Sequence, residues 1–162
     1  MKYLLLVSIL LFNFGKATAE DSNDLLIIDL NSSNGSSIGL NNFLWQKRVI
    51  IVFADNPEDP NFVGQIKLLR TRPTQLVERD VIVFTDTNPI PANLTRSKLR
   101  PKGFSFILIA KDGKISLRKS SPWSIREISR SIDKMPLRKQ EMKLLYKNLL
   151  KNHQIFTIIQ TP

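Results

Sequence analysis

Three runs of consecutive apolar residues divide the middle of the chain, and stretches rich in proline and polar side chains separate them. The runs occupy residues 48–54, 80–85 and 104–110 and are dominated by Val, Ile, Leu and Phe. A continuous run, unlike an alternating one, is typical of a strand that is buried on both faces of a sheet. We therefore predict that these three runs form the central strands of one sheet.

The segment between the first two predicted strands has the pattern of a loop followed by a helix. Residues 55–60 contain two prolines among acidic and amide side chains, which break the strand. Phe62, Ile66 and Leu69 then recur at the spacing of one helix face, and Pro73 kinks or splits that helix. A strand, a helix and a second buried strand form a βαβ unit, for which a right-handed crossover is expected.

The segment after the third predicted strand has the pattern of a hairpin. Lys111-Asp112-Gly113-Lys114 predicts a type I′ turn, because Asp-Gly supplies the positive φ angles of that turn. Residues 115–118 then return antiparallel to the third strand. Ser124 and Glu127 have the spacing of a capping box, so a helix is predicted to begin there.

The C-terminal segment has the pattern of an amphipathic helix. Pro136 interrupts the preceding helix, and a second helix is predicted over residues 137–151. Residues 155–159 are mostly apolar, and the pattern leaves open whether they form an edge strand or a loose end. The apolar stripe of the predicted helix consists of Met142, Leu145 and Leu149.

The first residues of the chain have the layout of an export signal. Lys2 precedes an apolar run over residues 4–14, and Ala17-Thr18-Ala19 forms a small-x-small cleavage site. The run is shorter than the roughly 20 residues that span a bilayer, and the alternative is an uncleaved anchor or a buried N-terminal helix. We therefore predict export to the periplasm or out of the cell, with no transmembrane segment after cleavage.

The pattern divides the chain into four parts. We predict a signal peptide over residues 1–19, a flexible leader over 20–42, one folded domain over 43–152 and a C-terminal tail over 153–162. The leader is rich in Ser, Asn and Asp, and its one apolar island at residues 25–28 is long enough for one short strand.

Composition excludes several kinds of chemistry. The chain has no Cys, which excludes disulfides, thiolate catalysis, iron–sulfur clusters and Cys-based zinc sites. It has a single His, which excludes His-rich metal sites and argues against a catalytic triad. Asp55, Glu58 and Asp59 cluster in one loop and could ligate Ca²⁺. Their spacing does not match the EF-hand pattern, and helix N-termini favour acidic residues without any metal. We therefore expect no cofactor and no metal ion.

Charge is distributed unevenly along the chain. Residues 20–95 carry 6 Lys and Arg against 10 Asp and Glu, whereas residues 96–162 carry 16 against 4. A basic face of this kind fits an anionic polymer, a membrane surface or an acidic protein, and no motif indicates specific nucleic-acid binding. The alternative is that these charges are only solvated helix faces. We predict a cationic rim at one end of the sheet, formed by Arg96, Lys98, Arg100, Lys102, Lys111, Lys114 and Arg118.

The predicted order of elements resembles a thioredoxin-like domain, and three segments together resemble one family of unknown function. These segments are Trp45-Gln46-Lys47-Arg48, Lys111-Asp112-Gly113 with Leu117-Arg118, and Pro122-Trp123-Ser124 through residues 135–142. Members of that family occur alone in exported bacterial proteins and, in animals, within sushi-repeat and related matrix-associated proteins. They are regarded as a peroxiredoxin-like branch of the thioredoxin superfamily. The resemblance implies an α/β, thioredoxin-like fold over residues 43–152, in which helices flank a central mixed sheet made of the βαβ unit and the antiparallel hairpin.

The chain departs from redox-active members of that superfamily in its active-site loop. The resemblance places their attacking cysteine in the loop after the first strand, where residues 55–60 hold no sulfur here. Ser105 stands about where their cis-proline is expected. We therefore predict no catalytic residue and a vestigial active-site loop made of Asp55, Asn56, Glu58, Asp59 and Ser105.

These observations predict an exported, non-redox thioredoxin-like module that acts by binding and contacts anionic partners through its basic C-terminal half. The first alternative is a peroxiredoxin-related, oxidoreductase-like enzyme that uses a non-thiol residue or a partner's cysteine. The second alternative is a small-ligand carrier, for which a deep pocket is the expected sign.

Overall fold

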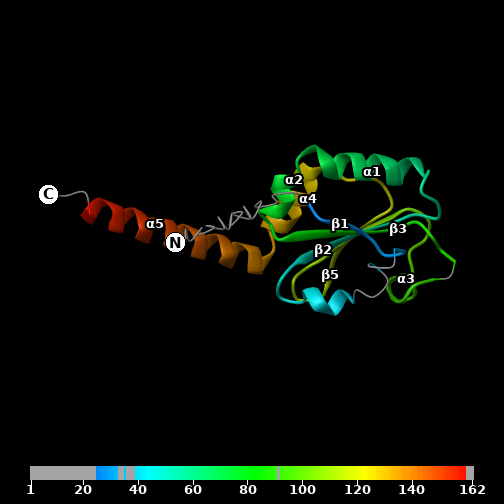
Figure 1. Ribbon diagram of the computed structural model, residues 1–162, viewed down its shortest axis with the longest axis horizontal. Helices are drawn as coiled ribbons and strands as arrows, with labels where there is room; N and C mark the ends of the chain where they lie inside the picture. The colour runs from blue at the N-terminus through cyan, green and yellow to red at the C-terminus, as the bar shows by residue number, and fades with distance from the viewer. Residues whose placement is uncertain (1–24, 33–34, 36–38, 91, 160–162) are drawn as a thin grey trace, which may run out of the picture.

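Five strands form one mixed sheet (Figure 1), and they are β1 (Ile27–Asp29), β2 (Arg48–Phe53), β3 (Val81–Asp86), β4 (Ser105–Ile109) and β5 (Ile115–Lys119). Their order across the sheet is β1-β3-β2-β4-β5. β1 and β2 run parallel to β3, whereas β4 is antiparallel to both β2 and β5. The computed structural model describes residues 25–32, 35, 39–90 and 92–159.

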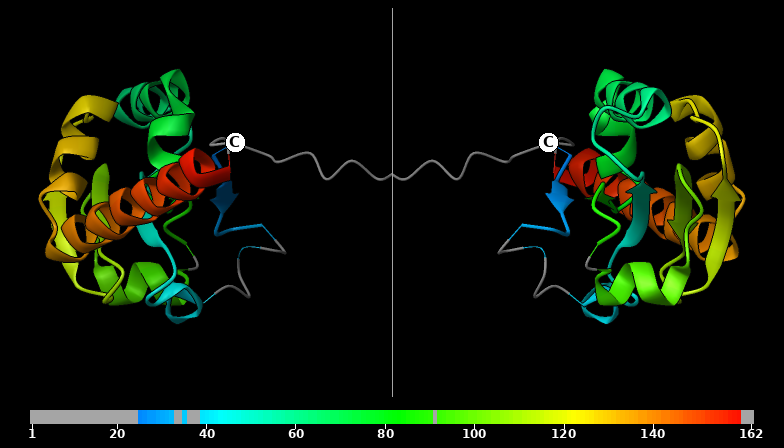
Figure 2. Two further views of the ribbon diagram at one scale, coloured as in Figure 1. Left: turned by 90° about the vertical axis from the view of Figure 1, so that its left-hand side faces the viewer. Right: turned by 90° about the vertical axis from the view of Figure 1, so that its right-hand side faces the viewer.

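Helices cover both faces of this sheet. They are α1 (Pro60–Thr71), α2 (Pro73–Val77), α3 (Leu94–Leu99), α4 (Ile125–Asp133), α5 (Pro136–Ile159) and the 3-10 helix η1 (Leu40–Phe43). α1, α2 and α4 lie on one face, and α3 and η1 lie on the other (Figure 1, Figure 2). Alternate residues of β2 serve the two cores, since Ile50 and Val52 pack under the first layer of helices while Val49 and Ile51 pack under the second.

The structure confirms the predicted centre of the sheet. β2, β3 and β4 are buried along their whole length, as their continuous apolar runs predict. Pro73 splits the predicted helix into α1 and α2, because proline cannot donate a backbone hydrogen bond inside a helix. The predicted capping box is present as well, since Ser124 caps the N–H of Glu127 and the Glu127 carboxylate accepts from the N–H of Ser124.

The turn between β4 and β5 is not the predicted type I′ turn. Within it only Gly113 has a positive φ, of 80°, whereas a type I′ turn requires two such residues. The N–H of Gly113 donates to the Ala110 carbonyl at 2.9 Å, and the N–H of Ala110 donates to the Lys114 carbonyl at 2.9 Å. The connection is therefore a three-residue loop closed by a glycine bulge, which leaves Lys111 and Asp112 in ordinary backbone conformations.

The predicted leader contributes a strand to the sheet. β1 pairs with β3 at the edge of the sheet and overlaps the apolar island at residues 25–28, so the short strand expected there is confirmed. Leu30, directly after β1, is buried. The fold therefore begins inside the segment 20–42. The expected cleavage site after Ala19 lies outside the described residues.

α5 is longer than the predicted helix and leaves the domain. It extends to Ile159, so residues 155–159 are helical and form neither an edge strand nor a loose end. No proline or glycine stands within residues 137–159, so the sequence holds no signal that ends the helix earlier. Figure 1 shows α5 projecting away from the sheet, and every side chain at 142–151 is exposed. Among the described helices, none combines the length and the apolar character needed to cross a membrane.

Candidate functional site

The carboxyl ends of β2 and β3 meet in a buried ion pair between Asp86 and Arg96. Asp86 is the last residue of β3, and Arg96 reaches it from α3. Arg96 Nε donates to Asp86 Oδ2 at 2.9 Å, and Arg96 Nη2 donates to Asp86 Oδ1 at 3.1 Å and to the Ala54 carbonyl at 2.7 Å. The guanidinium also lies 5.2 Å from the ring centre of Phe53. We call Asp86 and Arg96 the carboxyl-end pair.

Three asparagines hold the Asp86 carboxylate besides Arg96. Asn93 Nδ2 donates to Oδ2 at 2.9 Å, while Asn31 Nδ2 and the backbone N–H of Asn88 each donate to Oδ1 at 3.1 Å. Burial by itself raises the pKa of Asp86, but the hydrogen bonds from Arg96 and the asparagines outweigh burial and hold that pKa below its ordinary value. Asp86 is therefore a fixed anion, unsuited to exchanging protons near neutral pH.

The predicted vestigial loop lies beside this pair, and its residues have separate roles. Asp55 is 59% exposed, and its Oδ1 lies 3.5 Å from Arg96 Nη1. Asn56 and Glu58 are exposed to solvent. Asp59 caps α1, where its carboxylate accepts hydrogen bonds from two backbone N–H groups at 2.8 and 3.1 Å. In the described part of the chain, no three acidic or histidine side chains gather as a metal site would require.

Ser105 lies at the same end of the sheet as the loop. It begins β4, pairs in register with Phe53 of β2, and is buried. Its Oγ donates to the Lys102 carbonyl at 3.4 Å. The structure therefore brings Ser105 and Asp55 to one sheet end, but it gives Ser105 a hydrogen bond within its own loop.

The structure corrects the prediction of one cationic rim at one end of the sheet. β4 runs antiparallel to β2, so Lys102 before β4 and Lys111 after it lie at opposite ends. Arg96 and Lys111 are also buried in ion pairs, with Asp86 and Asp80 respectively, and do not face solvent. The exposed members of the predicted set are Lys98, Arg100, Lys102, Lys114 and Arg118.

The opposite end of the sheet holds a second buried arginine. Arg48, the first residue of β2, is 1% exposed, and its Nη2 donates to both carboxylate oxygens of Glu141 in α5 at 3.0 and 3.1 Å. Its Nη1 donates to the Arg79 carbonyl at 2.8 Å. Lys111 Nζ lies 2.8 Å from Glu141 Oε1 and 2.8 Å from Asp80 Oδ2. We call Arg48, Asp80, Lys111 and Glu141 the amino-end cluster.

Two further arginines connect this cluster to the helices around it. Arg79 forms a two-bond pair with Asp133 of α4, with both distances at 2.9 Å. Arg138 of α5 lies 3.4 Å from Glu141 Oε2 and 3.6 Å from Asp133 Oδ1. The cluster therefore fastens the first turns of α5 to the sheet and to α4.

Both carboxylates of the cluster are held as anions. Burial raises the pKa of each, but hydrogen bonding and charge from Lys111, with a contribution from Arg48, hold the pKa of Asp80 and of Glu141 below its ordinary value. Asp80 and Trp45 adopt left-handed backbone conformations, with φ of 53° and 64°, and this conformation is costly for a tryptophan. The N–H of Trp45 is held there by the Lys111 carbonyl at 2.7 Å.

An open cleft of about 320 Å³ lies beside the cluster. Its lining joins Trp45, Arg48 and Lys111 to the first turn of α5. The three segments on which the family resemblance rests therefore converge here, since they contain Arg48, Lys111 and Glu141. The sequence pattern did not pair Arg48 with Glu141, because 93 residues separate them. No local signal could have found this contact.

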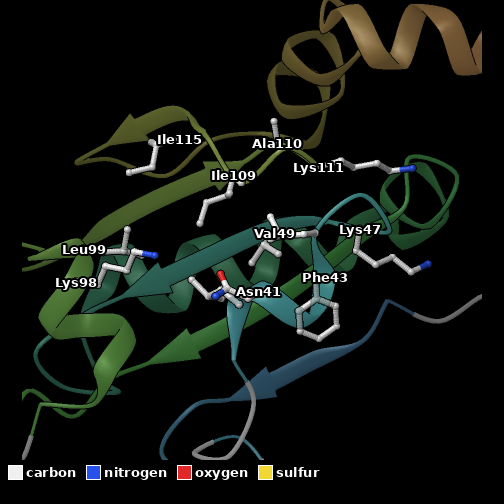
Figure 3. A pocket seen from close by; sticks show the side chains of 13 residues that line it. Asn41, Phe43, Lys47, Val49, Lys98, Leu99, Ile109, Ala110, Lys111 and Ile115 are labelled. Carbon is white, nitrogen blue, oxygen red and sulfur yellow. The ribbon is translucent and has the colours of Figure 1, made fainter.

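A smaller cavity lies on the face of the sheet that α3 and η1 cover (Figure 3). Phe43, Val49 and Ile109 are among the side chains that line its volume of about 120 Å³. Lys47 and Lys98 lie on opposite sides of it in Figure 3. Pockets for small ligands commonly measure roughly 300 Å³ or more. This cavity is therefore smaller than a typical small-ligand pocket.

Comparisons with solved structures agree with the fold. The reduced 2-Cys peroxiredoxin of Plasmodium vivax matches with a TM-score of 0.50 at 16% identity, covering 64% of this chain and 85% of that chain. The chloroplastic thioredoxin z matches with a TM-score of 0.50 at 16% identity, covering 67% of this chain and 91% of that chain. These likenesses show that the fold is thioredoxin-like.

Sequence comparisons place the chain in a family. It is 27% identical over 135 residues to coiled-coil domain-containing protein 80 of Danio rerio. This match covers 65% of this chain and 16% of that protein. The chain thus spans a small part of that relative. The model of the family described as "Domain of unknown function (DUF4174)" matches residues 39–141, which begin just before η1 and end at Glu141 of the amino-end cluster. The chain belongs to the DUF4174 family, and the matched segment carries its thioredoxin-like fold.

Proposed function

We propose that this protein is an exported binding module that has kept the thioredoxin-like fold without its thiol chemistry. The proposal rests on what the carboxyl end of the sheet contains. There Asp86 and Arg96 are buried against each other, and the chain contains no cysteine. Thiol–disulfide and peroxide chemistry of thioredoxin-like proteins needs a thiolate as nucleophile, so recognition is the activity that this end can support.

The partner that fits the exposed charge is anionic. Lys98, Arg100 and Lys102 are exposed between β3 and β4. Arg118 is exposed on β5 and donates to the Leu99 carbonyl at 2.9 Å, which places it against the same segment. These four cations therefore form one positive surface that a polymer, a membrane or an acidic protein can contact. The layout of residues 1–19 supports the export of this module.

Activity assays test the absence of thiol chemistry. The chain from Glu20 onward, which contains every described element, is incubated with hydrogen peroxide or with insulin in the presence of a dithiol reductant. We expect rates equal to those of the buffer, because no residue can form the attacking thiolate. Turnover by the chain alone would overturn the proposal in favour of an enzyme with a non-thiol residue. Turnover that requires an added cysteine-bearing protein would favour catalysis with a partner's cysteine.

Retention on immobilised heparin tests the anionic partner. We expect retention to weaken steeply with salt, and the triple variant Lys98→Gln, Arg100→Gln and Lys102→Gln to elute at lower salt than the native chain. A matched control removes three exposed charges from the segment around the end of α1, as Lys67→Gln, Arg70→Gln and Arg72→Gln. Retention that does not depend on salt, or equal effects of the two triple variants, would contradict the proposed surface.

A further inference from the structure

We infer that the projecting part of α5 binds the surface of an anionic lipid bilayer and lies along the interface. This inference rests on the proposed binding function and names the occupant of a second surface. It concerns residues 142–151, which directly follow the segment that the family model matches. The inferred contact is therefore a property of this chain beyond its shared domain.

An apolar stripe on this segment is left uncovered by the fold. Met142, Leu145, Tyr146 and Leu149 stand at the i, i+3, i+4 and i+7 positions of one helix face. Their exposed fractions lie between 48% and 67%. Scattered apolar side chains on a surface are ordinary, but a contiguous stripe on a projecting helix marks a contact with another surface.

The side of the same segment that lies away from the stripe carries three lysines, with Leu144 as the apolar residue among them. Lys143, Lys147 and Lys151 follow one another at four-residue spacing, and all three are exposed. The chain contains no Asp or Glu after Glu141. A helix with an apolar stripe and a lysine-rich opposite face is suited to the bilayer interface, where apolar side chains enter the acyl boundary and lysines reach the phosphates.

Charge decides between a bilayer and a second copy of this chain. Two α5 helices packed by their stripes would leave the lysines, which lie away from the stripe, without a negatively charged partner, because no carboxylate follows Glu141. An anionic lipid surface offers negative charge to all the lysines at once. Since α5 is not apolar enough to cross a membrane, the interfacial orientation is the one that fits.

The amino-end cluster presents the helix to such a surface. Glu141, the residue directly before the segment, is bound by Arg48 and Lys111. The base of α5 is therefore fixed while the rest projects from the domain, as Figure 1 shows.

Co-sedimentation with lipid vesicles tests the inference. The chain from Glu20 onward is mixed with vesicles of phosphatidylglycerol and phosphatidylcholine, and separately with vesicles of phosphatidylcholine alone. We expect at least tenfold tighter binding to the vesicles that contain phosphatidylglycerol, with a loss of binding as salt is raised. Equal binding to both kinds of vesicle, or binding to neither, would overturn the inference.

Two leucines of similar exposure provide a matched pair of variants. Leu145 lies on the stripe and is 55% exposed, whereas Leu144 lies off it and is 62% exposed. We expect Leu145→Ser to weaken vesicle binding at least fivefold and Leu144→Ser to change it less than twofold. Lys147→Gln should weaken binding about fivefold at low salt. Equal losses in the two leucine variants would show that the stripe is not the contact surface.

Two controls assign the cause of a failure. Because these side chains are exposed, the thermal unfolding midpoint of each variant should match that of the native chain, which shows that the domain stays folded. A chain that heparin retains but vesicles do not bind would overturn the bilayer contact and leave the proposed anionic binding intact. A chain retained by neither would overturn both. A salt-independent dimer that Leu145→Ser dissociates would assign the stripe to a second copy.

Discussion

The two ends of the sheet each bury an arginine against a carboxylate, but the two pairs do different things. At the carboxyl end, Asp86 and Arg96 are 10 residues apart and fill the space beside the predicted vestigial loop. At the amino end, Arg48 and Glu141 are 93 residues apart and join the first turns of α5 to the first central strand. The same chemistry therefore fills a site at one end and links distant parts of the fold at the other.

The two ends also differ in how completely their polar atoms are satisfied. The Asp86 carboxylate is held by Arg96 and three asparagines. At the amino end, the buried Nε atoms of Arg48 and Arg138 have no protein hydrogen-bond partner among the described residues.

The largest expected effect comes from breaking the carboxyl-end pair. Arg96→Leu leaves the buried Asp86 without its counter-charge, and removal of one partner from a buried ion pair costs about 3 to 5 kcal/mol of unfolding free energy. Denaturant unfolding at pH 7 measures this loss. Adding Asp86→Asn to the variant should recover part of it, because the uncompensated charge is gone. A loss below about 1 kcal/mol would show that the pair does not support the fold.

A smaller effect is expected at the amino end. Glu141→Gln keeps one acceptor for Arg48 but removes the charge, so we expect a loss of about 2 kcal/mol in unfolding free energy. Amide hydrogen exchange should also rise at the start of α5, because that helix loses its attachment to the sheet. Glu78→Gln is the matched control, since Glu78 is 68% exposed beside the same cluster. Unchanged exchange in α5 would contradict the proposed attachment.

Lowering the pH should reduce the unfolding free energy through the carboxylates at both ends of the sheet. The contribution of each carboxylate should be smaller than the effects of the two substitutions above. The pKa values of Asp80, Asp86 and Glu141 are lowered from 3.8, 3.8 and 4.5, so the unfolded chain binds protons more readily than the folded one. Their stabilising effect is present above these ordinary values and is lost as pH falls below about 4. Each carboxylate contributes at most one proton, or about 1.4 kcal/mol per pH unit.

Denaturant unfolding between pH 7 and pH 3 measures this dependence. Asp86→Asn and Glu141→Gln should each flatten the acid side of the curve, one for each end of the sheet. An unfolding free energy that stays constant or rises toward pH 3 would contradict the assigned anions.

The smallest effect is expected from the exposed member of the loop. Asp55→Asn should change the unfolding free energy by about 0.5 kcal/mol or less, because Asp55 is 59% exposed and Arg96 keeps its pairing with Asp86. The same denaturant measurement applies. A loss comparable to that of Arg96→Leu would show that the loop belongs to the buried network and that the two ends resemble each other more than the distances indicate.

Features that depend on local pattern could be predicted from the sequence. The continuous apolar runs located β2, β3 and β4, because burial on both faces leaves no polar position in a strand. The helix break at Pro73 and the capping box at Ser124 could also be predicted, since each depends on residues within one turn of a helix.

Features that depend on three-dimensional placement could not be predicted. Arg96 was expected to face solvent, but α3 directs it to the end of β3, where Asp86 holds it. Lys111 was expected to stand with Lys102, but the antiparallel course of β4 carries it to the other end of the sheet. The turn at Gly113 differed from the prediction because the Asp-Gly pair is compatible with more than one loop length.

The positions of the two tryptophans make each end of the sheet separately visible by fluorescence. Trp45 is 69% exposed beside the amino-end cluster. Trp123 follows β5 at the other end, where Lys119, the partner of Phe106 in the sheet, lies 4.6 Å from its ring centre. With only two indoles in the chain, a single Phe replacement leaves one emitter whose spectrum reports on one end. The molecule thus carries its own optical probes, and events at either end can be followed without a chemical label.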